Sequence, residues 1–199
     1  LGSQVGNTDG FAANWGAAVV WFAHRDRLIT GYDIKAGDVI VGLEETSLRS
    51  NGISLIRRVL STHIGENWHE QDIDGTPIID MALAPSTIYT GALVEMFGGY
   101  HMKQKPAATL SAVANVTGGG LPSKLGRALK PSGLGAVVDD PFDPPALMLH
   151  TQRLGEVDDR EAYRTWHMGQ GMIVITSDPD SVRAVATKHG INSKNIGRI

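Results

Sequence analysis

Residues 171–177, GMIVITS, constrain the fold most, because they set four apolar residues in a row between small and polar ones. A short run of this kind, rich in β-branched residues, predicts a buried strand. The run DVIVGL at 38–43 predicts a second strand, and residues 50–64 then repeat apolar residues at helical spacing. Because strands and helices mix without a strict period, the sequence predicts an α+β fold, a mixed sheet with helices packed on one face.

The same patterns predict the remaining elements. Helices are expected at 84–97 with Pro85 in the first turn, at 122–130, 145–155 and 159–168, and at 178–190 with Asp178 or Asp180 as the cap. The other expected strands are a buried one at 16–23, a brief one within 131–145 and an edge strand at 191–199.

The composition is that of an ordinary globular chain, and it excludes several classes of function. With a net charge of −3 over 199 residues, the chain lacks the clustered Lys and Arg of a nucleic-acid-binding protein. The absence of cysteine excludes disulfides, thiolate metal sites and cysteine nucleophiles. No apolar run is long enough to span a bilayer. We therefore expect a cytoplasmic protein without nucleic-acid or membrane partners.

The junction between the strand at 38–43 and the helix that follows has two interpretations. Arg49, Ser50, Asn51 and Gly52 stand immediately before the helical apolar pattern. Ser50 or Asn51 is suited to cap the helix, because a short polar side chain accepts a hydrogen bond from its free N–H groups. A helix start next to glycine and arginine is also a ready site for an anion such as phosphate.

The loop NVTGGGLPSKLGRAL at 115–129 is the most informative motif. Three consecutive glycines before a helix permit positive φ and a close approach of the backbone to a ligand. The spacing matches neither a phosphate-binding P-loop nor a dinucleotide fingerprint. A tight turn needs only one glycine, so three favour ligand approach at Thr117, Gly118, Gly119 and Gly120.

The other polar motifs give weaker signals. His167 lies in YRTWHMGQGM between aromatics and a Gly-x-Gly, where we interpret it as a packing residue rather than a base or metal ligand. The carboxylates at 139–143 and 156–161 have the character of helix caps and solvated turns. The sequence therefore predicts no metal site, and it assigns no catalytic residue.

Five motifs in one order resemble a known family. GDVIVGL, SNGISLIRRVL, LAPSTIY, NVTGGGLPSKLGRAL and EAYRTWHMGQGMIVI are similar to the carboxyl-terminal half of aminoimidazole ribonucleotide (AIR) synthase, or phosphoribosylformylglycinamidine cyclo-ligase. The resemblance runs from about residue 16 to the end. It implies an ATP- and Mg²⁺-dependent cyclo-ligase of purine biosynthesis that converts formylglycinamidine ribonucleotide to AIR.

The resemblance also implies a division of labour and a set of partners. An amino-terminal half would bind most of the ATP and Mg²⁺, and full-length chains would form homodimers. The residues implied to line the cleft for the ribonucleotide and its phosphate are Arg49, Ser50, Asn51 and Gly52, together with Thr117, Gly118, Gly119 and Gly120.

Two positions depart from the family pattern. Asn115 stands where a histidine is common before the glycines, and Thr87 stands where a cation is usual before Ile-Tyr. The loss of a cation near a phosphate weakens binding, because charge-assisted hydrogen bonds are about twice as strong as neutral ones. Arg49 and Lys124 are the candidate replacements, and a different substrate is the alternative.

We expect residues 1–36 to be a remnant of the preceding ATP-binding domain, its last strand and a linker, and residues 37–199 to be the carboxyl-terminal domain. The chain is then either cut from a longer one, which we favour, or completed by a separate subunit. Two other readings stay open. One is a relative of the same architecture, such as selenophosphate synthetase, thiamine-monophosphate kinase or the hydrogenase-maturation protein, and the other is a non-catalytic ligand-binding module.

Overall fold

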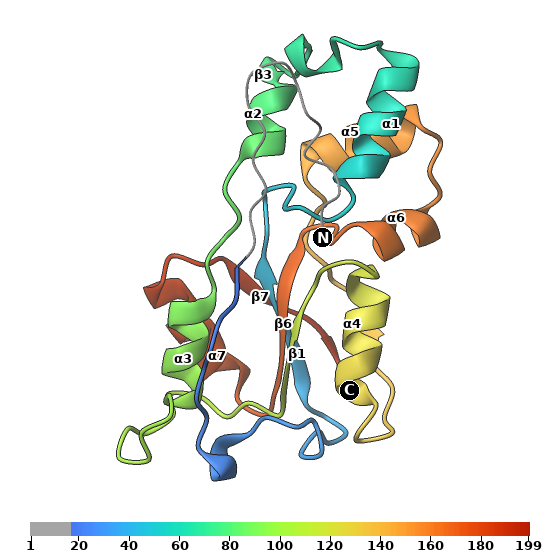
Figure 1. The fold of residues 1–199 in the computed structure, drawn as a ribbon. Helices are drawn as coiled ribbons and strands as arrows, with labels where there is room; N and C mark the ends of the chain where they lie inside the picture. The colour runs from blue at the N-terminus through green and yellow to red at the C-terminus, as the bar shows by residue number, and fades with distance from the viewer. Residues whose placement is uncertain (1–16) are drawn as a thin grey trace.

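The structure, a computed structural model, describes residues 17–199. Its strands and helices alternate irregularly along the chain (Figure 1). The strands are β1 (Val39–Glu44), β2 (Asp72–Ile73), β3 (Thr76–Pro77), β4 (Ala112–Asn115), β5 (Val137–Val138), β6 (Gln170–Thr176) and β7 (Ser193–Arg198). The α-helices are α1 (Ile53–His63), α2 (Ile78–Leu83), α3 (Thr90–Phe97), α4 (Gly120–Leu129), α5 (Ala146–Leu154), α6 (Asp159–Thr165) and α7 (Pro179–Lys188), with short 3₁₀ turns at Arg25–Arg27 and Trp68–Glu70.

One five-stranded sheet organises the molecule, and its strand order is β4-β6-β1-β7-β5. Every pairing in this sheet is antiparallel, where a mixed sheet was expected. The long central strands run from Val39 opposite Thr176 to Glu44 opposite Gln170. Their register shifts between Leu43 and Glu44, so the pairing is irregular just where the chain enters the polar loop after β1.

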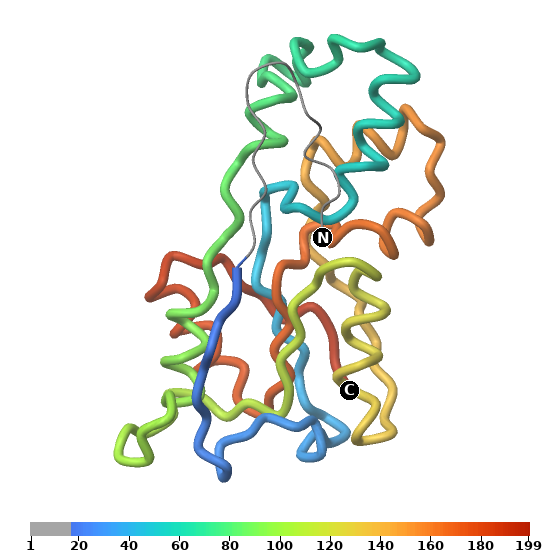
Figure 2. Tube along the Cα trace, viewed as in Figure 1, coloured from blue at the N-terminus to red at the C-terminus, as the bar shows by residue number. Residues whose placement is uncertain are grey.

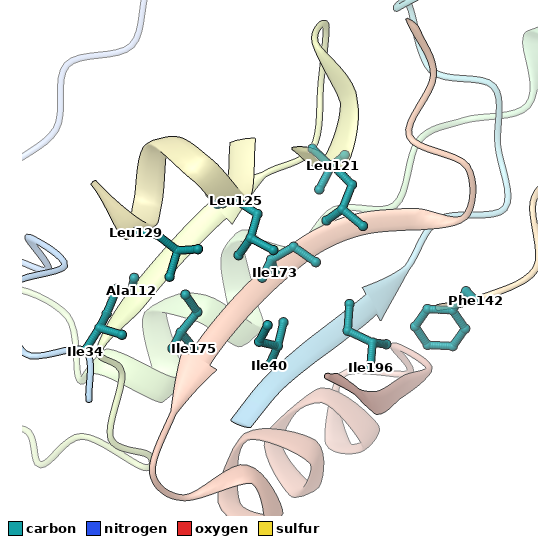
Figure 3. Close-up of a cluster of buried hydrophobic side chains, with 12 residues drawn as sticks. Ile34, Ile40, Ala112, Leu121, Leu125, Leu129, Phe142, Ile173, Ile175 and Ile196 are labelled. Atoms are coloured by element: carbon teal, nitrogen blue, oxygen red, sulfur yellow. The ribbon is translucent and has the colours of Figure 1, made fainter. Parts of the chain in front are cut away.

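One face of the sheet is covered by α4 (Figure 3). The helix presents Leu121, Leu125 and Leu129, whose spacing of four places them on a single face. They pack on sheet residues of alternate positions, among them Ile173 and Ile175 of β6.

The opposite face is covered by α3 and α7. Here β6 contributes Met172 and Val174, which pack with Met96 of α3 and Val182 and Val185 of α7. The α+β class is thus confirmed, but the expectation that helices pack on one face is wrong. The reason lies in β6, whose residues are all buried, because both faces of the strand are covered.

A third apolar cluster lies beyond the end of the sheet, at the top of Figure 1. It joins α1, α2, α5 and α6 around the fully buried Trp166. This helical cap holds the loop that connects β1 to α1. It therefore positions one of the two glycine-containing loops predicted to bind ligand.

Several local predictions need correction. Residues 17–23 of the expected buried strand are exposed and form no strand, and Gly16 lies outside the described residues. Residues 84–89 form no helix and α3 begins at Thr90, so Pro85 precedes α3 instead of starting it. The strand β7 is internal rather than an edge, because the two-residue β5 pairs with it.

The segment at residues 17–27, which precedes the first strand of the sheet, follows the outside of the molecule. Figure 2 shows it as an extended run that passes the carboxyl end of α3. Trp21 stacks edge-on against Phe97 with ring centroids 5.8 Å apart. The Arg27 guanidinium donates to the carbonyl oxygens of Gly98 and Gly99, at 2.6 and 3.0 Å. The segment is thus fixed at two points.

None of the helices in residues 17–199 is both long enough and apolar enough to cross a membrane.

Candidate ligand-binding site

The junction before α1 is built on the backbone of Gly52. This residue has φ 84° and is the N-cap of α1, with no side-chain cap. Its carbonyl oxygen accepts from the N–H groups of Leu55 and Ile56, and from the indole Nε1 of Trp166 at 3.3 Å. A Cβ at Gly52 would collide with the Trp166 ring. The prediction that Ser50 or Asn51 caps the helix is therefore wrong, and Ser50 is exposed.

The three glycines at the start of α4 have different surroundings. A Cβ on Gly118 would lie 2.6 Å from the amide nitrogen of Asn51. Gly119 is the N-cap of α4 with φ 92°. A Cβ on Gly120 would fall on the carbonyl oxygen of Tyr163 in α6. The third glycine thus serves helix packing, which the sequence pattern did not distinguish from ligand approach.

These contacts bring the two predicted loops together at one end of the sheet. Asn51 approaches the backbone at Gly118, and the turn closes where the Gly120 N–H donates to the Thr117 carbonyl at 2.8 Å. The Arg49 guanidinium joins the same region, since its Nη1 donates to the carbonyls of Val116 and Gly171 at 3.0 and 3.2 Å. Arg49 and Val116, which are 67 positions apart in the sequence, thereby lie in contact at this end of the sheet.

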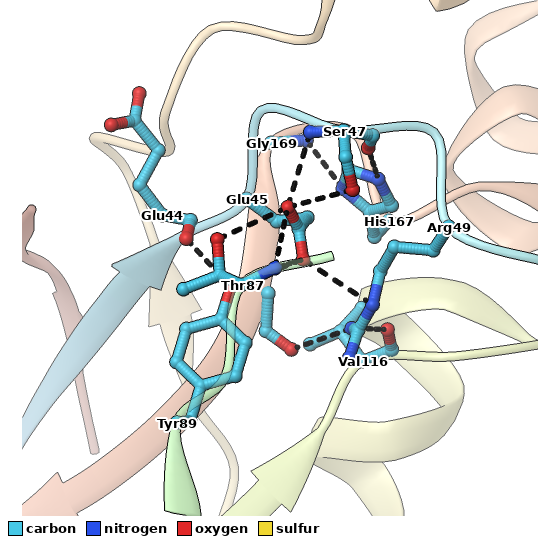
Figure 4. A network of polar contacts seen from close by, with 10 residues as sticks. Glu44, Glu45, Ser47, Arg49, Thr87, Tyr89, Val116, His167 and Gly169 are labelled. Atoms are coloured by element: carbon cyan, nitrogen blue, oxygen red, sulfur yellow. Dashed lines mark hydrogen bonds and ion pairs between the residues drawn. The ribbon is translucent and has the colours of Figure 1, made fainter. Parts of the chain in front are cut away.

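A buried carboxylate that the sequence analysis missed fixes Arg49 (Figure 4). The Glu45 carboxylate lies 3.4 Å from Arg49 Nε and has no exposed side-chain surface. It accepts from the N–H and hydroxyl of Ser47, at 3.1 and 2.9 Å, and from the N–H of Thr87 at 3.2 Å. The spacing of four between Glu45 and Arg49 was the signal available in the sequence.

Thr87 and Tyr89 complete this network from the extended segment before α3. The Thr87 hydroxyl lies 3.3 Å from Glu45 Oε1, and the Tyr89 hydroxyl donates to the Glu44 carbonyl at 2.6 Å. Burial, and then the nearby Glu45 carboxylate, raise the pKa of the Tyr89 phenol. Thr87 therefore serves as a donor to a buried anion at the position where a cation was expected.

His167 occupies the neighbouring corner as a packing residue, as predicted. Its Nδ1 accepts from the Gly169 N–H at 3.1 Å, so Nε2 is the nitrogen that donates to the Ser47 carbonyl at 2.8 Å. Burial lowers the pKa of its imidazole. The neutral ring thus ties the turn before β6 to the loop after β1.

A cavity of about 430 Å³ opens beside the glycine loop. It lies between the edge strand β4, the helix α4 and the segment at 29–31. Its polar lining consists of Thr30, Asn115 and Thr117 together with Lys124 and Arg127 of α4. The sequence analysis named Asn115, Thr117 and Lys124 but missed Arg127. Arg127 lies three residues after Lys124, a spacing that makes the two side chains neighbours on the helix surface.

Between residues 17 and 199, no group of three His, Cys, Asp or Glu side chains is arranged to hold a metal ion. The chemistry of this region rests on backbone N–H groups, amides, hydroxyls and the cations Arg49, Lys124 and Arg127. Such a donor set suits an anionic ligand.

Comparison with known proteins gives a consistent result. A family model described as AIR synthase related protein, C-terminal domain, matches residues 35–199. The chain is similar to the phosphoribosylformylglycinamidine cyclo-ligase of Nitrosospira multiformis, with 37% identity over 81% of the chain and 43% of the relative. It is similar to the protein of the same name from Methylobacillus flagellatus, with 35% identity over 91% of the chain and 50% of the relative. The protein of that name from Methanocaldococcus jannaschii is 33% identical over 91% of the chain and 50% of its own length. The chain thus spans about half the length of these relatives.

Proposed function

Because the chain belongs to the AIR synthase related family through its C-terminal domain, we propose that it is the carboxyl-terminal half of a phosphoribosylformylglycinamidine cyclo-ligase. In this role it supplies the side of the cleft that holds formylglycinamidine ribonucleotide. The observation that carries the proposal is the convergence of the loops at 49–52 and 117–120, with Asn51 beside the backbone of Gly118.

The proposal divides the reaction between two halves. An amino-terminal half, in the same polypeptide or as a separate subunit, binds ATP and Mg²⁺, which activate the amide oxygen of the substrate for ring closure. Within residues 17–199 no metal-ligand cluster is present, so we assign no step through the metal to this chain. The complete enzyme is proposed to act as a cytoplasmic homodimer.

The residues of this chain then bind and orient the substrate. The Glu45–Arg49 pair holds the loop at 49–52 against the carbonyls of Val116 and Gly171. Asn51 and Thr117 present an amide and a hydroxyl near the glycine backbone. A preorganised loop of this kind lowers the entropic cost of orienting the reacting groups.

Binding of formylglycinamidine ribonucleotide to the 199-residue chain tests this proposal. We expect saturable binding by calorimetry, weakened in the Asn51→Ala and Thr117→Val variants. The matched control is Asn67→Ala, an exposed residue beyond the far end of α1. Absence of binding in the unaltered, folded chain would overturn the proposal.

A turnover assay separates an enzyme half from a non-catalytic module. The chain alone should release no phosphate from ATP, because phosphoryl transfer depends on a metal and a phosphate cradle. Addition of the amino-terminal half of a relative should give ATP-dependent product. Thr87 favours the second candidate, a binding module without activity, because it donates to Glu45 instead of presenting a cation. Substrate binding without turnover in the reconstituted pair would support that candidate.

A further inference from the structure

The cavity beside β4 has a one-sided charge. Its lining includes the cations Lys124 and Arg127 and no carboxylate. Among residues 17–199, neither cation forms an ion pair. Two cations that share a concave surface repel one another unless an anion lies between them. The cavity is therefore suited to an anionic ligand.

The helix α4 fixes the direction of both cations. Leu121, Leu125 and Leu129 turn one side of the helix to the sheet. Lys124 and Arg127, three residues apart, occupy a neighbouring side that lines the cavity. Lys124 is half-buried there, which removes part of its charge from water and strengthens its attraction for an anion.

Asn115 and Thr117 supply neutral hydrogen-bonding groups to the same cavity. Asn115 ends β4, an edge strand that pairs on one side with β6. The amide of Asn115 both donates and accepts, and the Thr117 hydroxyl does the same. These groups recognise hydroxyls next to an anion, as a sugar phosphate presents them.

The structure also discriminates between Arg49 and Lys124, the two candidate replacements for the cation expected at position 87. Arg49 is committed, since Glu45 and the carbonyls of Val116 and Gly171 already occupy its guanidinium. Lys124 has no such partner in the described part of the chain, and it faces a cavity of about 430 Å³. That volume falls within the range of small-molecule pockets, about 300–1,000 Å³.

We propose that Lys124 and Arg127, with Asn115 and Thr117, form a binding site for a sugar phosphate monoester. Lys124 and Arg127 bind the phosphate, and the two neutral side chains bind the sugar hydroxyls. This inference rests on the proposed function only in naming the occupant, which is then the 5′-phosphate end of the ribonucleotide. The site itself stands on the lining of the cavity.

Titration of the 199-residue chain with ribose 5-phosphate, inorganic phosphate and ribose tests the site. Addition of ribose 5-phosphate should shift the amide NMR signals of residues 115–117, and addition of ribose should leave them unchanged. Inorganic phosphate should bind more weakly at the same residues. Lys124→Gln and Arg127→Gln should each weaken ribose 5-phosphate binding by about tenfold, since each removes a charge-assisted bond. The control is Lys130→Gln, an exposed lysine after α4 that does not line the cavity and should leave binding unchanged.

Two outcomes overturn the inference. One is that ribose 5-phosphate fails to bind the unaltered chain. The other is that it binds equally to the Lys124→Gln, Arg127→Gln and Lys130→Gln variants. The thermal midpoint of each variant checks that the fold is retained. Failure of the proposed function gives a different pattern, because sugar phosphate would still bind while the reconstituted pair formed no product.

Discussion

Glu45 illustrates how one side chain connects segments that are distant in the sequence. Burying an ionised carboxylate is costly unless it is paired and hydrogen-bonded. Here the compensation comes from Arg49 and from donors on Ser47 and Thr87. The carboxylate therefore couples the loop after β1 to the segment before α3, and through Arg49 to β4 and β6.

The Glu45→Gln variant should be strongly destabilised. It leaves Arg49 unpaired in a largely buried position, and it turns an amide NH₂ toward N–H donors. Loss of one partner of a buried ion pair typically costs about 3–5 kcal/mol. Urea unfolding measures the loss. The control Glu44→Gln changes an exposed contact with Asn192 and should shift stability by about 0.5 kcal/mol or less. Equal effects of the two substitutions would contradict the assigned role of the network.

His167 should make the stability of the domain depend on pH. Burial lowers its pKa in the folded state, whereas in the unfolded chain it titrates near 6.5. Below pH 6.5 the unfolded state therefore binds a proton that the folded state does not, so stability declines as the pH falls from 6.5 toward the lowered pKa. Denaturant unfolding between pH 5 and 8 measures the slope. A His167→Gln variant that keeps the same slope would show that other groups are responsible.

Among the elements, α4 shows how a glycine-rich helix start is shaped by its neighbours. Gly120 has φ 59° and packs against the backbone of Tyr163, whereas Gly126 has open space around it. The two glycines are in one helix, yet only the first is required by packing.

Substitution of these two glycines by alanine should act in opposite directions. Gly120→Ala forces α4 and α6 apart and strains a left-handed backbone, at a cost of about 2 kcal/mol or more. Gly126→Ala should stabilise by about 0.5–1 kcal/mol, because alanine loses less entropy in a helix. Thermal unfolding of both variants checks the pair. A stable Gly120→Ala protein would show that α6 is not packed against this glycine.

For the molecule as a whole, the segment at 17–22 is the feature that the domain leaves unexplained. Val19 and Phe22 are 89% and 72% exposed, next to Trp21. A run of exposed apolar residues marks an interaction surface. We propose that in the complete enzyme this surface faces the amino-terminal half, and the boundary near residue 36 remains a prediction.

The Val19→Ser and Phe22→Ser double variant should leave stability unchanged and reduce self-association of the isolated chain. Exposed side chains contribute little apolar burial to the folded state. The thermal midpoint and size-exclusion chromatography over a range of concentrations measure the two effects. Ile173→Ser is the contrasting control, because this fully buried residue should lower the midpoint markedly. A large fall in the midpoint of the double variant would mean that the segment packs in the domain.

Local patterns in the sequence were sufficient to predict most elements of the fold. The four apolar residues of β6, the apolar spacing of α1 and the cap at Asp178, which accepts from Ser181 N–H, are all present as expected. Such features depend on neighbours within a few residues. The family resemblance, carried by motifs in order, is likewise confirmed by the match over residues 35–199.

Long-range packing determined the rest, and no local pattern contains it. The sequence could not tell that β6 is covered on both faces, or that Gly52 replaces Ser50 and Asn51 at the start of α1, because these outcomes depend on α7 and on Trp166. It offered Arg49 and Lys124 as equal candidates for an anion. In the folded chain the Glu45 carboxylate pairs with Arg49, whereas Lys124 faces a cavity. Folding decides this difference, because the attraction between two charges is strong only when they lie within a few ångströms of each other.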